Sequence, residues 1–174
     1  MTNPETQIAT WFATYDAPIA KVGKALRAKL RARLPGLKEL VYVYERQESL
    51  VFSYSPTEAG AAGVAGVAVY PDRVSLFLAG GPALSKADPK KLLRGSGKTV
   101  RHVELDSVDA FDRPEIETLI AAALDAAKVR LDPEAKGAVV LKADEQQQRA
   151  ARAKRTTGAK PAQAKPKRPK KPVR

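Results

Sequence analysis

The sequence predicts an α+β domain, with helices packed on an antiparallel sheet of about five strands, followed by a disordered basic tail. Apolar residues recur at helical intervals near both ends of residues 1–142, and apolar and polar residues alternate between them, as in strands. The strand-like stretches are joined by short links, which favour an antiparallel meander over parallel units with crossover helices. We therefore predict a domain over residues 1–142 and a tail over residues 143–174.

Two helices are predicted at the N-terminus. Residues 5–14 carry an apolar stripe at helical spacing and form the first, short helix. Asp16 is assigned as the N-cap of the second helix, and Pro18 lies in its first turn, where the missing N–H costs little. This helix is predicted to run to about Leu34, because Pro35-Gly36 stops it.

Four strand-like stretches come next, at residues 37–44, 50–55, 64–70 and 73–79. Alternation within them places apolar side chains on both faces of the sheet: Val41 and Val43 point away from Tyr42 and Tyr44. We expect helices to cover one face and the other to be a partly open surface lined by aromatic residues.

Gly80-Gly81-Pro82 is predicted to break the sheet, a short helix to follow over residues 89–94, and a fifth strand over residues 99–105. Residues 95–99 read Gly-Ser-Gly-Lys-Thr, like the end of a phosphate-binding loop. That loop needs a further glycine where this chain has Leu92, a strand before it and a helix after it. We therefore interpret the string as a glycine turn that leads into an edge strand.

A last helix is predicted over residues 113–130. Asp112 is assigned as its N-cap, and Glu115 and Glu117 complement the positive end of the helix dipole. Residues 139–141 form the last hydrophobic anchor before the tail.

The composition excludes several kinds of site. The chain has no Cys, which removes thiolate nucleophiles, redox pairs and Cys-based zinc sites. His102 is the single His, so no site with two His ligands can form. It lies in the predicted fifth strand, facing away from Val103, and we expect it to pack its ring there rather than to act in catalysis.

Acidic residues gather before the last helix, and two interpretations are open. Carboxylates suit hard cations, so a ridge of these residues would hold iron weakly. The alternative, which we favour, is that they are solvent-facing, capping or dipole-complementing residues. The four candidate iron ligands are Glu104, Asp106, Asp109 and Asp112.

Aromatic side chains and a basic helix are two further features with open interpretations. Trp11 and the five tyrosines are candidates to line a small-molecule pocket, although aromatic residues at these spacings are more often part of a core. The second helix carries basic residues from Lys21 to Arg33, most simply as a solvated surface.

Charge is concentrated at the C-terminus. Of 31 basic residues, eleven lie in residues 149–174, which contain no Asp or Glu. The remaining 20 stand against 19 acidic residues, so residues 1–148 are nearly neutral and carry little of the net charge of +12. Low hydrophobicity and high charge predict that the tail is disordered in isolation.

Clustered Lys and Arg without aromatic side chains are typical of sequence-independent contact with nucleic-acid phosphates. No aromatic residue follows Phe111, which argues against stacking on single-stranded bases. The alternative is a solubilising extension. The candidate phosphate contacts are Arg149, Arg152, Lys154, Arg155, Lys160, Lys165, Lys167, Arg168, Lys170, Lys171 and Arg174.

Several stretches carry a likeness to a known family. They are the basic helix ending at Pro35-Gly36, the glycine break at residues 80–82, and residues 39–44 (ELVYVY), 92–105 (LLRGSGKTVRHVEL) and 111–116 (FDRPEI). With these, residues 15–142 resemble the YdhG-like domain family of bacteria, whose function is largely unknown. The resemblance implies a small α+β domain of helices on a sheet. Some members are regarded as frataxin-like iron chaperones, but no ligand motif transfers to this chain.

We therefore expect a non-enzymatic, cytoplasmic binding domain without a cofactor, whose tail contacts DNA or RNA nonspecifically. The alternatives are an iron-handling protein that uses the acidic ridge and a domain that binds a small molecule. No apolar run approaches about 18 residues, and the N-terminal residues lack the pattern of a signal peptide, so no membrane span is predicted.

Overall fold

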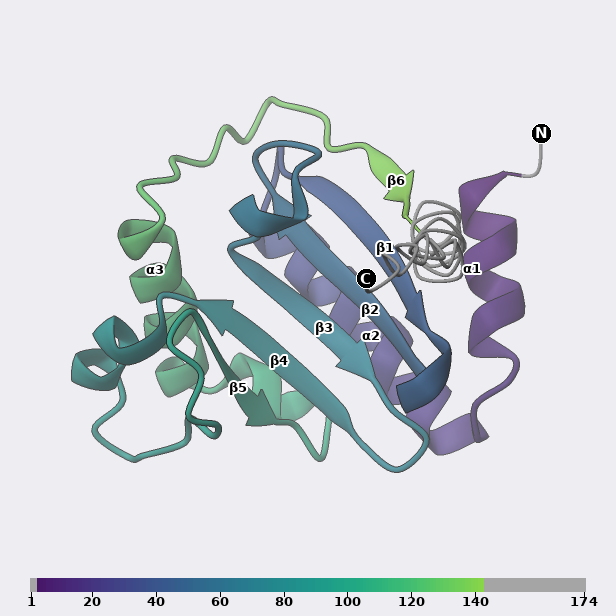
Figure 1. Ribbon diagram of the computed structural model, residues 1–174, viewed down its shortest axis with the longest axis horizontal. Helices are drawn as coiled ribbons and strands as arrows, with labels where there is room; N and C mark the ends of the chain where they lie inside the picture. Colours follow the sequence, from purple (N-terminus) through teal and green to yellow (C-terminus); the bar gives the residue numbers. More distant parts are fainter. Residues whose placement is uncertain (1–2, 143–174) are drawn as a thin grey trace, which may run out of the picture. The chain divides into compact units, whose positions relative to one another are not determined.

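A six-stranded sheet lies at the centre of the fold (Figure 1), in a computed structural model that describes residues 3–142. The strand order is β5-β4-β3-β2-β1-β6. The four middle strands pair antiparallel with their neighbours in sequence, which confirms the predicted meander. They are β1 (Lys38–Tyr44), β2 (Ser49–Ser55), β3 (Ala65–Val69) and β4 (Val74–Ala79).

The two outer strands are short and come from the C-terminal half. β5 (Val100–Glu104) pairs antiparallel with β4 at one edge, as an edge strand was predicted to do. β6 (Val139–Leu141) pairs parallel with β1 at the other edge. The sequence predicted β6 only as a hydrophobic anchor, because three residues are too few to show a strand period.

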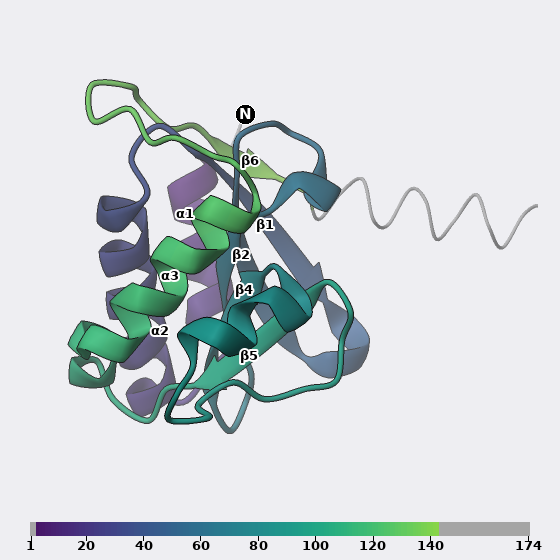
Figure 2. The same ribbon diagram turned by 90° about the vertical axis from the view of Figure 1, so that its left-hand side faces the viewer.

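All three α-helices lie on one face of the sheet, here called the helix face (Figures 1 and 2). They are α1 (Pro4–Phe12), α2 (Ala17–Arg33) and α3 (Pro114–Ala126). Asn3 caps α1, its side-chain oxygen accepting the N–H of Glu5 at 2.9 Å. Asp16 occupies the N-cap position of α2 as predicted, but its side chain makes no capping hydrogen bond. None of the helices within residues 3–142 is long and apolar enough to cross a membrane.

The core lies between these helices and the helix face. Phe12 of α1 stacks on Phe52 of β2, with ring centroids 5.6 Å apart. Leu26 and Leu30 of α2 are fully buried against the sheet. Gly23 lets α2 approach β3 closely, since a Cβ at this position would lie 2.8 Å from Cγ2 of Val69. The helix-covered face predicted from the alternation is confirmed.

The opposite face, here called the open face, carries aromatic side chains as predicted. Tyr42 and Tyr44 of β1 stack with centroids 6.0 Å apart, and Tyr44 is 39% exposed. The ring of His102 lies 5.6 Å from that of Phe77, while its neighbour Val103 is buried in the core. The prediction that His102 packs its ring on the face away from Val103 is confirmed.

The prediction of a short helix over residues 89–94 is wrong. A 3-10 helix forms earlier, over Gly81–Ala87, and the chain then turns. The carboxylate of Asp88 accepts the N–H groups of Leu92 and Leu93 at 2.8 and 2.9 Å. Because these bonds satisfy the backbone outside a helix, the local pattern of helix formers is overridden.

The last helix is shorter than predicted and differently capped. It ends at Ala126, because Lys128 adopts a left-handed φ of 55° and Val129 donates its N–H back to the carbonyl of Leu124 at 3.0 Å. This bond closes the last turn in the manner of a Schellman motif. The N-cap is Arg113, so the assignment of Asp112 to that position is wrong.

Candidate functional site

The predicted phosphate contacts lie outside the described residues. All eleven basic residues from Arg149 to Arg174 fall in this part of the chain. Their contact with nucleic acid stays a prediction that rests on charge alone.

The four candidate iron ligands are not brought together. The carboxylate of Asp112 binds Nζ of Lys29 at 2.5 Å, and Glu104 lies on β5 with Nε of Arg73 4.0 Å away. Asp106 and Asp109 are exposed in the link between β5 and α3. Within residues 3–142, no three His, Cys, Asp or Glu side chains form a group that suits a metal ion.

The basic side of α2 is largely paired with carboxylates rather than solvated. Beyond the Lys29–Asp112 pair, Arg33 holds Glu117 of α3 through Nε at 2.8 and 2.9 Å. Arg31 reaches Glu5 of α1 at 3.2 Å. Because these pairs join α2 to its neighbours, the basic residues of α2 act mainly within the fold.

Arg27 is the centre of a buried polar network. Its guanidinium donates two hydrogen bonds to Glu39 of β1 and two to Glu5, all at 2.8 Å. Glu39 is only 2% exposed and also accepts the hydroxyl of Tyr54 at 2.7 Å. Burial lowers the pKa of Arg27, but its hydrogen bonds with Glu39 and Glu5 raise the pKa above its ordinary value. Burial raises the pKa of Tyr54, and the Glu39 carboxylate raises it further.

The Gly-Ser-Gly-Lys-Thr string does not form a phosphate loop. The preceding Arg94 pairs with His102 as an isolated bridge, and β5 rather than a helix follows the string. Arg101 donates a hydrogen bond to the carbonyl of Gly95, which closes the turn. The predicted glycine turn into an edge strand is confirmed.

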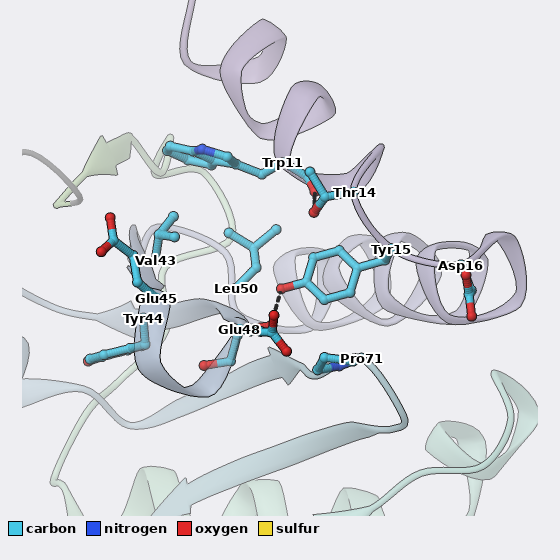
Figure 3. A pocket seen from close by; sticks show the side chains of 11 residues that line it. Trp11, Thr14, Tyr15, Asp16, Val43, Tyr44, Glu45, Glu48, Leu50 and Pro71 are labelled. Atoms are coloured by element: carbon cyan, nitrogen blue, oxygen red, sulfur yellow. Dashed lines mark hydrogen bonds between the residues drawn. The ribbon is translucent and has the colours of Figure 1, made fainter.

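A pocket of about 510 Å³ lies at the end of the sheet where β1 turns into β2 (Figure 3). It is here called the aromatic pocket. Its residues come from the end of α1 and its link to α2, from the β1–β2 connection, and from the turn between β3 and β4. They are Trp11, Thr14, Tyr15, Asp16, Val43, Tyr44, Glu45, Glu48, Ser49, Leu50 and Pro71.

Aromatic and aliphatic side chains form most of this pocket. Trp11 and Tyr15 flank Val43 and Leu50 in Figure 3, whereas the ring of Tyr44 points to the open face, where it stacks on Tyr42. The hydroxyl of Tyr15 donates to the backbone carbonyl of Glu48 at 2.8 Å, which ties the α1–α2 link to the turn after β1. Burial raises the pKa of Tyr15, so this hydroxyl stays protonated as a donor at neutral pH.

The polar groups of the aromatic pocket are acidic or neutral. Asp16, Glu45 and Glu48 line it, whereas no Lys, Arg or His does. Ser49 also lines it and is 1% exposed, and its hydroxyl has no hydrogen-bond partner among the described residues. Ser49 lies opposite Tyr44 in the pairing of β1 with β2, and its hydroxyl oxygen is buried within the protein rather than open to the pocket.

The sequence indicated part of this pocket. Trp11 and the tyrosines were candidate pocket residues, and Trp11, Tyr15 and Tyr44 are among the residues that line it, Tyr44 with its ring turned to the open face. Tyr54 instead belongs to the core. The contribution of Glu48 and Ser49 was missed, because the sequence placed them only in a turn. Their proximity to α1 depends on tertiary packing and gives no local signal.

In comparisons with family models, curated proteins and solved structures, none matches the chain. The resemblance to the YdhG-like family therefore stays a prediction, and the geometry of the chain itself carries the functional argument.

Proposed function

We propose that the folded body is a non-enzymatic binding domain that holds a small organic molecule in the aromatic pocket. The observation that carries this proposal is a pocket of about 510 Å³ in which Trp11 and Tyr15 flank the apolar side chains of Val43 and Leu50 (Figure 3). Sites for small ligands have volumes of roughly 300–1,000 Å³, mostly apolar linings and a few polar groups that orient the ligand.

The residues of the pocket favour binding over catalysis. No His, Lys or Cys lines it, and no described group lies within hydrogen-bond distance of the Ser49 hydroxyl to act as its base. Activation of a serine needs such a base. The same features are suited to holding a ligand by apolar contact and a few hydrogen bonds.

Trp11 gives a direct test, since it is the only Trp of the chain and lines the pocket. Its fluorescence should change with saturation when the full chain is titrated with small phenyl compounds of different charge. Tyr15→Leu should weaken this binding about two- to tenfold, the value of one aromatic contact. Phe77→Ala, which removes a half-buried aromatic ring on the open face, should leave it unchanged. An absence of saturable change with every compound would contradict the proposal.

A second function, contact between the C-terminal segment and DNA or RNA, is favoured by the distribution of charge. The basic residues of α2 are largely paired with Glu5, Asp112 and Glu117, and residues 1–148 are nearly neutral. The uncompensated positive charge of the chain lies in residues 149–174. Electrostatics of this kind binds phosphate backbones without reading their sequence.

A gel-shift assay tests this second function. The full chain should shift DNA and RNA of unrelated sequence at low salt. Contact with six to ten phosphates would make affinity fall roughly 10³–10⁵-fold between 50 and 200 mM salt. Replacing the eleven basic residues of 149–174 by Gln should abolish the shift, whereas Lys21→Gln with Lys24→Gln on α2 should preserve it. Full retention by the first variant would exclude the C-terminal segment as the binding element.

A further inference from the structure

We infer that the aromatic pocket selects an organic cation, an amine or ammonium group on a small hydrophobic body. This inference rests on the proposed function of the pocket and names the chemical class of its ligand. Two independent features of the lining support it: the sign of its charges and its aromatic side chains.

The charges around the pocket have one sign. Asp16, Glu45 and Glu48 contribute three carboxylates, and no basic side chain lines the pocket. None of the three forms an ion pair or a side-chain hydrogen bond with another described residue. This contrasts with Glu5, Asp112 and Glu117, which are paired with basic residues of α2. The carboxylates at the pocket therefore remain available to a positively charged ligand.

The aromatic rings add a second attraction for the same charge. The face of a Trp or Tyr ring is negative, and a cation over it gains about 0.5–1 kcal/mol at exposed sites and more when desolvated. Trp11 and Tyr15 both line this pocket on the side of Val43 and Leu50. The fold uses this contact elsewhere, since the guanidinium of Arg73 lies 4.2 Å from the ring centroid of Tyr70. Acidic and aromatic residues together favour a cation over an anion or a neutral molecule.

The remaining lining indicates an organic rather than an inorganic cation. Part of the lining is apolar and comes from Val43, Leu50 and Pro71. Such side chains offer no ligand atoms to a metal ion but can contact the hydrocarbon part of an organic cation. Within residues 3–142, the carboxylates of the pocket do not form a group of three or more side chains that could hold a metal ion.

Three probes of similar size and different charge test the inference on the full chain at pH 7. They are 2-phenylethylamine, which is a cation, 2-phenylethanol, which is neutral, and 3-phenylpropionate, which is an anion. Trp11 fluorescence and calorimetry should both show that the amine binds at least about tenfold more tightly than the alcohol, the sum of cation–π and carboxylate attraction. The anion should bind more weakly than either.

Charge variants separate the carboxylates from the apolar lining. Glu45→Gln combined with Glu48→Gln should weaken binding of the amine about five- to tenfold and leave binding of the alcohol unchanged. Both residues are exposed, so the double variant is expected to fold, and its melting curve checks this. Glu134→Gln, which changes an exposed carboxylate that does not line the pocket, is the matched control and should leave the amine affinity unchanged.

The outcomes distinguish the inference from the proposed function beneath it. Equal affinity for all three probes, or an unchanged amine affinity in the double variant, would overturn the preference for a cation while the pocket remains a binding site. If none of the probes changes Trp11 fluorescence or gives heat, both the inference and the proposed function fail.

Discussion

At the scale of single residues, Arg27 joins three elements through one guanidinium group. Its planar fork holds Glu5 of α1 and Glu39 of β1, two hydrogen bonds to each, and thereby orients both elements relative to α2. Arg27 is 12% exposed and Glu39 2%. A buried charge of this kind is tolerated only while its partner is present.

Glu39→Ala should therefore lower the free energy of unfolding by about 3–5 kcal/mol, because it leaves the buried guanidinium of Arg27 with only the half-exposed Glu5 as a partner and removes the shorter of the two hydrogen bonds of the Tyr54 hydroxyl. Denaturant unfolding with linear extrapolation measures this loss. The matched control is Glu117→Ala, which breaks a more exposed pair with Arg33 and should cost less than about 1 kcal/mol. Equal losses in the two variants would show that burial of the network has no energetic consequence.

Glu5 predicts a pH dependence. Hydrogen bonds from Arg27 hold the pKa of Glu5 below its ordinary value of 4.5, against the opposing effect of partial burial. A carboxyl with a lowered folded-state pKa stabilises the fold above its unfolded pKa, and this stabilisation is lost as the pH falls through the folded value. Glu5→Gln should flatten the decline in melting temperature below about pH 4.5, whereas Glu134→Gln should not. If the melting temperature of Glu5→Gln falls below about pH 4.5 as steeply as that of the original chain, Glu5 is not the source of this pH dependence.

At the scale of elements, the closeness of α2 and β3 is set by a residue without a side chain. Gly23 faces Val69 of β3, and the ring of Phe12 of α1 is also close to its Cα. Val69 is fully buried, and as a β-branched residue it has few alternative rotamers. The three elements therefore meet at a point that has no room for a methyl group.

Gly23→Ala tests this packing because two effects oppose each other. Helix propensity alone would stabilise α2 by about 1 kcal/mol. The added methyl would lie 2.8 Å from Val69 and 3.0 Å from Phe12, and overpacking costs about 1–3 kcal/mol. We expect a net loss of up to about 2 kcal/mol in the free energy of unfolding. Ala28→Gly on the exposed side of α2 should cost about 1 kcal/mol from propensity alone, and a gain in Gly23→Ala would contradict the close packing.

At the scale of the whole molecule, charge and core belong to different parts of the chain. The described core and its ion pairs lie within residues 3–142, while eleven of the basic residues lie beyond residue 148. The residues that form the described core and the residues proposed to bind polyanions therefore lie in different regions of the sequence.

Removal of residues 149–174 should change one of these properties and preserve the other. The net charge would fall from +12 to +1, so retention on a cation exchanger at pH 7 should be lost. The free energy of unfolding should change by less than about 0.5 kcal/mol, as for surface changes away from the core. Denaturant titration of both chains checks the second expectation. A larger destabilisation would mean that the core depends on the C-terminal segment.

The sequence predicted those features that depend on local pattern. The meander followed from alternation, and the glycine turn before β5 from the absence of a helix after Gly-Ser-Gly-Lys-Thr. Features set by distant partners were missed: Asp112 binds Lys29 instead of capping α3, and Asp88 binds backbone groups where a helix was expected. In the aromatic pocket, Trp11 gave a compositional signal, but the contact of Tyr15 with Glu48 depends on tertiary packing and had no signal in the local sequence.

The parallel pairing of β6 has a consequence for self-association. β1 spans seven residues, most of them apolar or aromatic, and without β6 it would be an outer strand with free N–H and C=O groups. Long, flat, apolar edges are templates on which a second chain adds, and natural sheets avoid them with short or covered borders. β6 pairs with Glu39–Val41 of β1 and itself presents only three residues at that border. We therefore expect the short segment at residues 139–141 to reduce edge-to-edge aggregation at this end of the sheet.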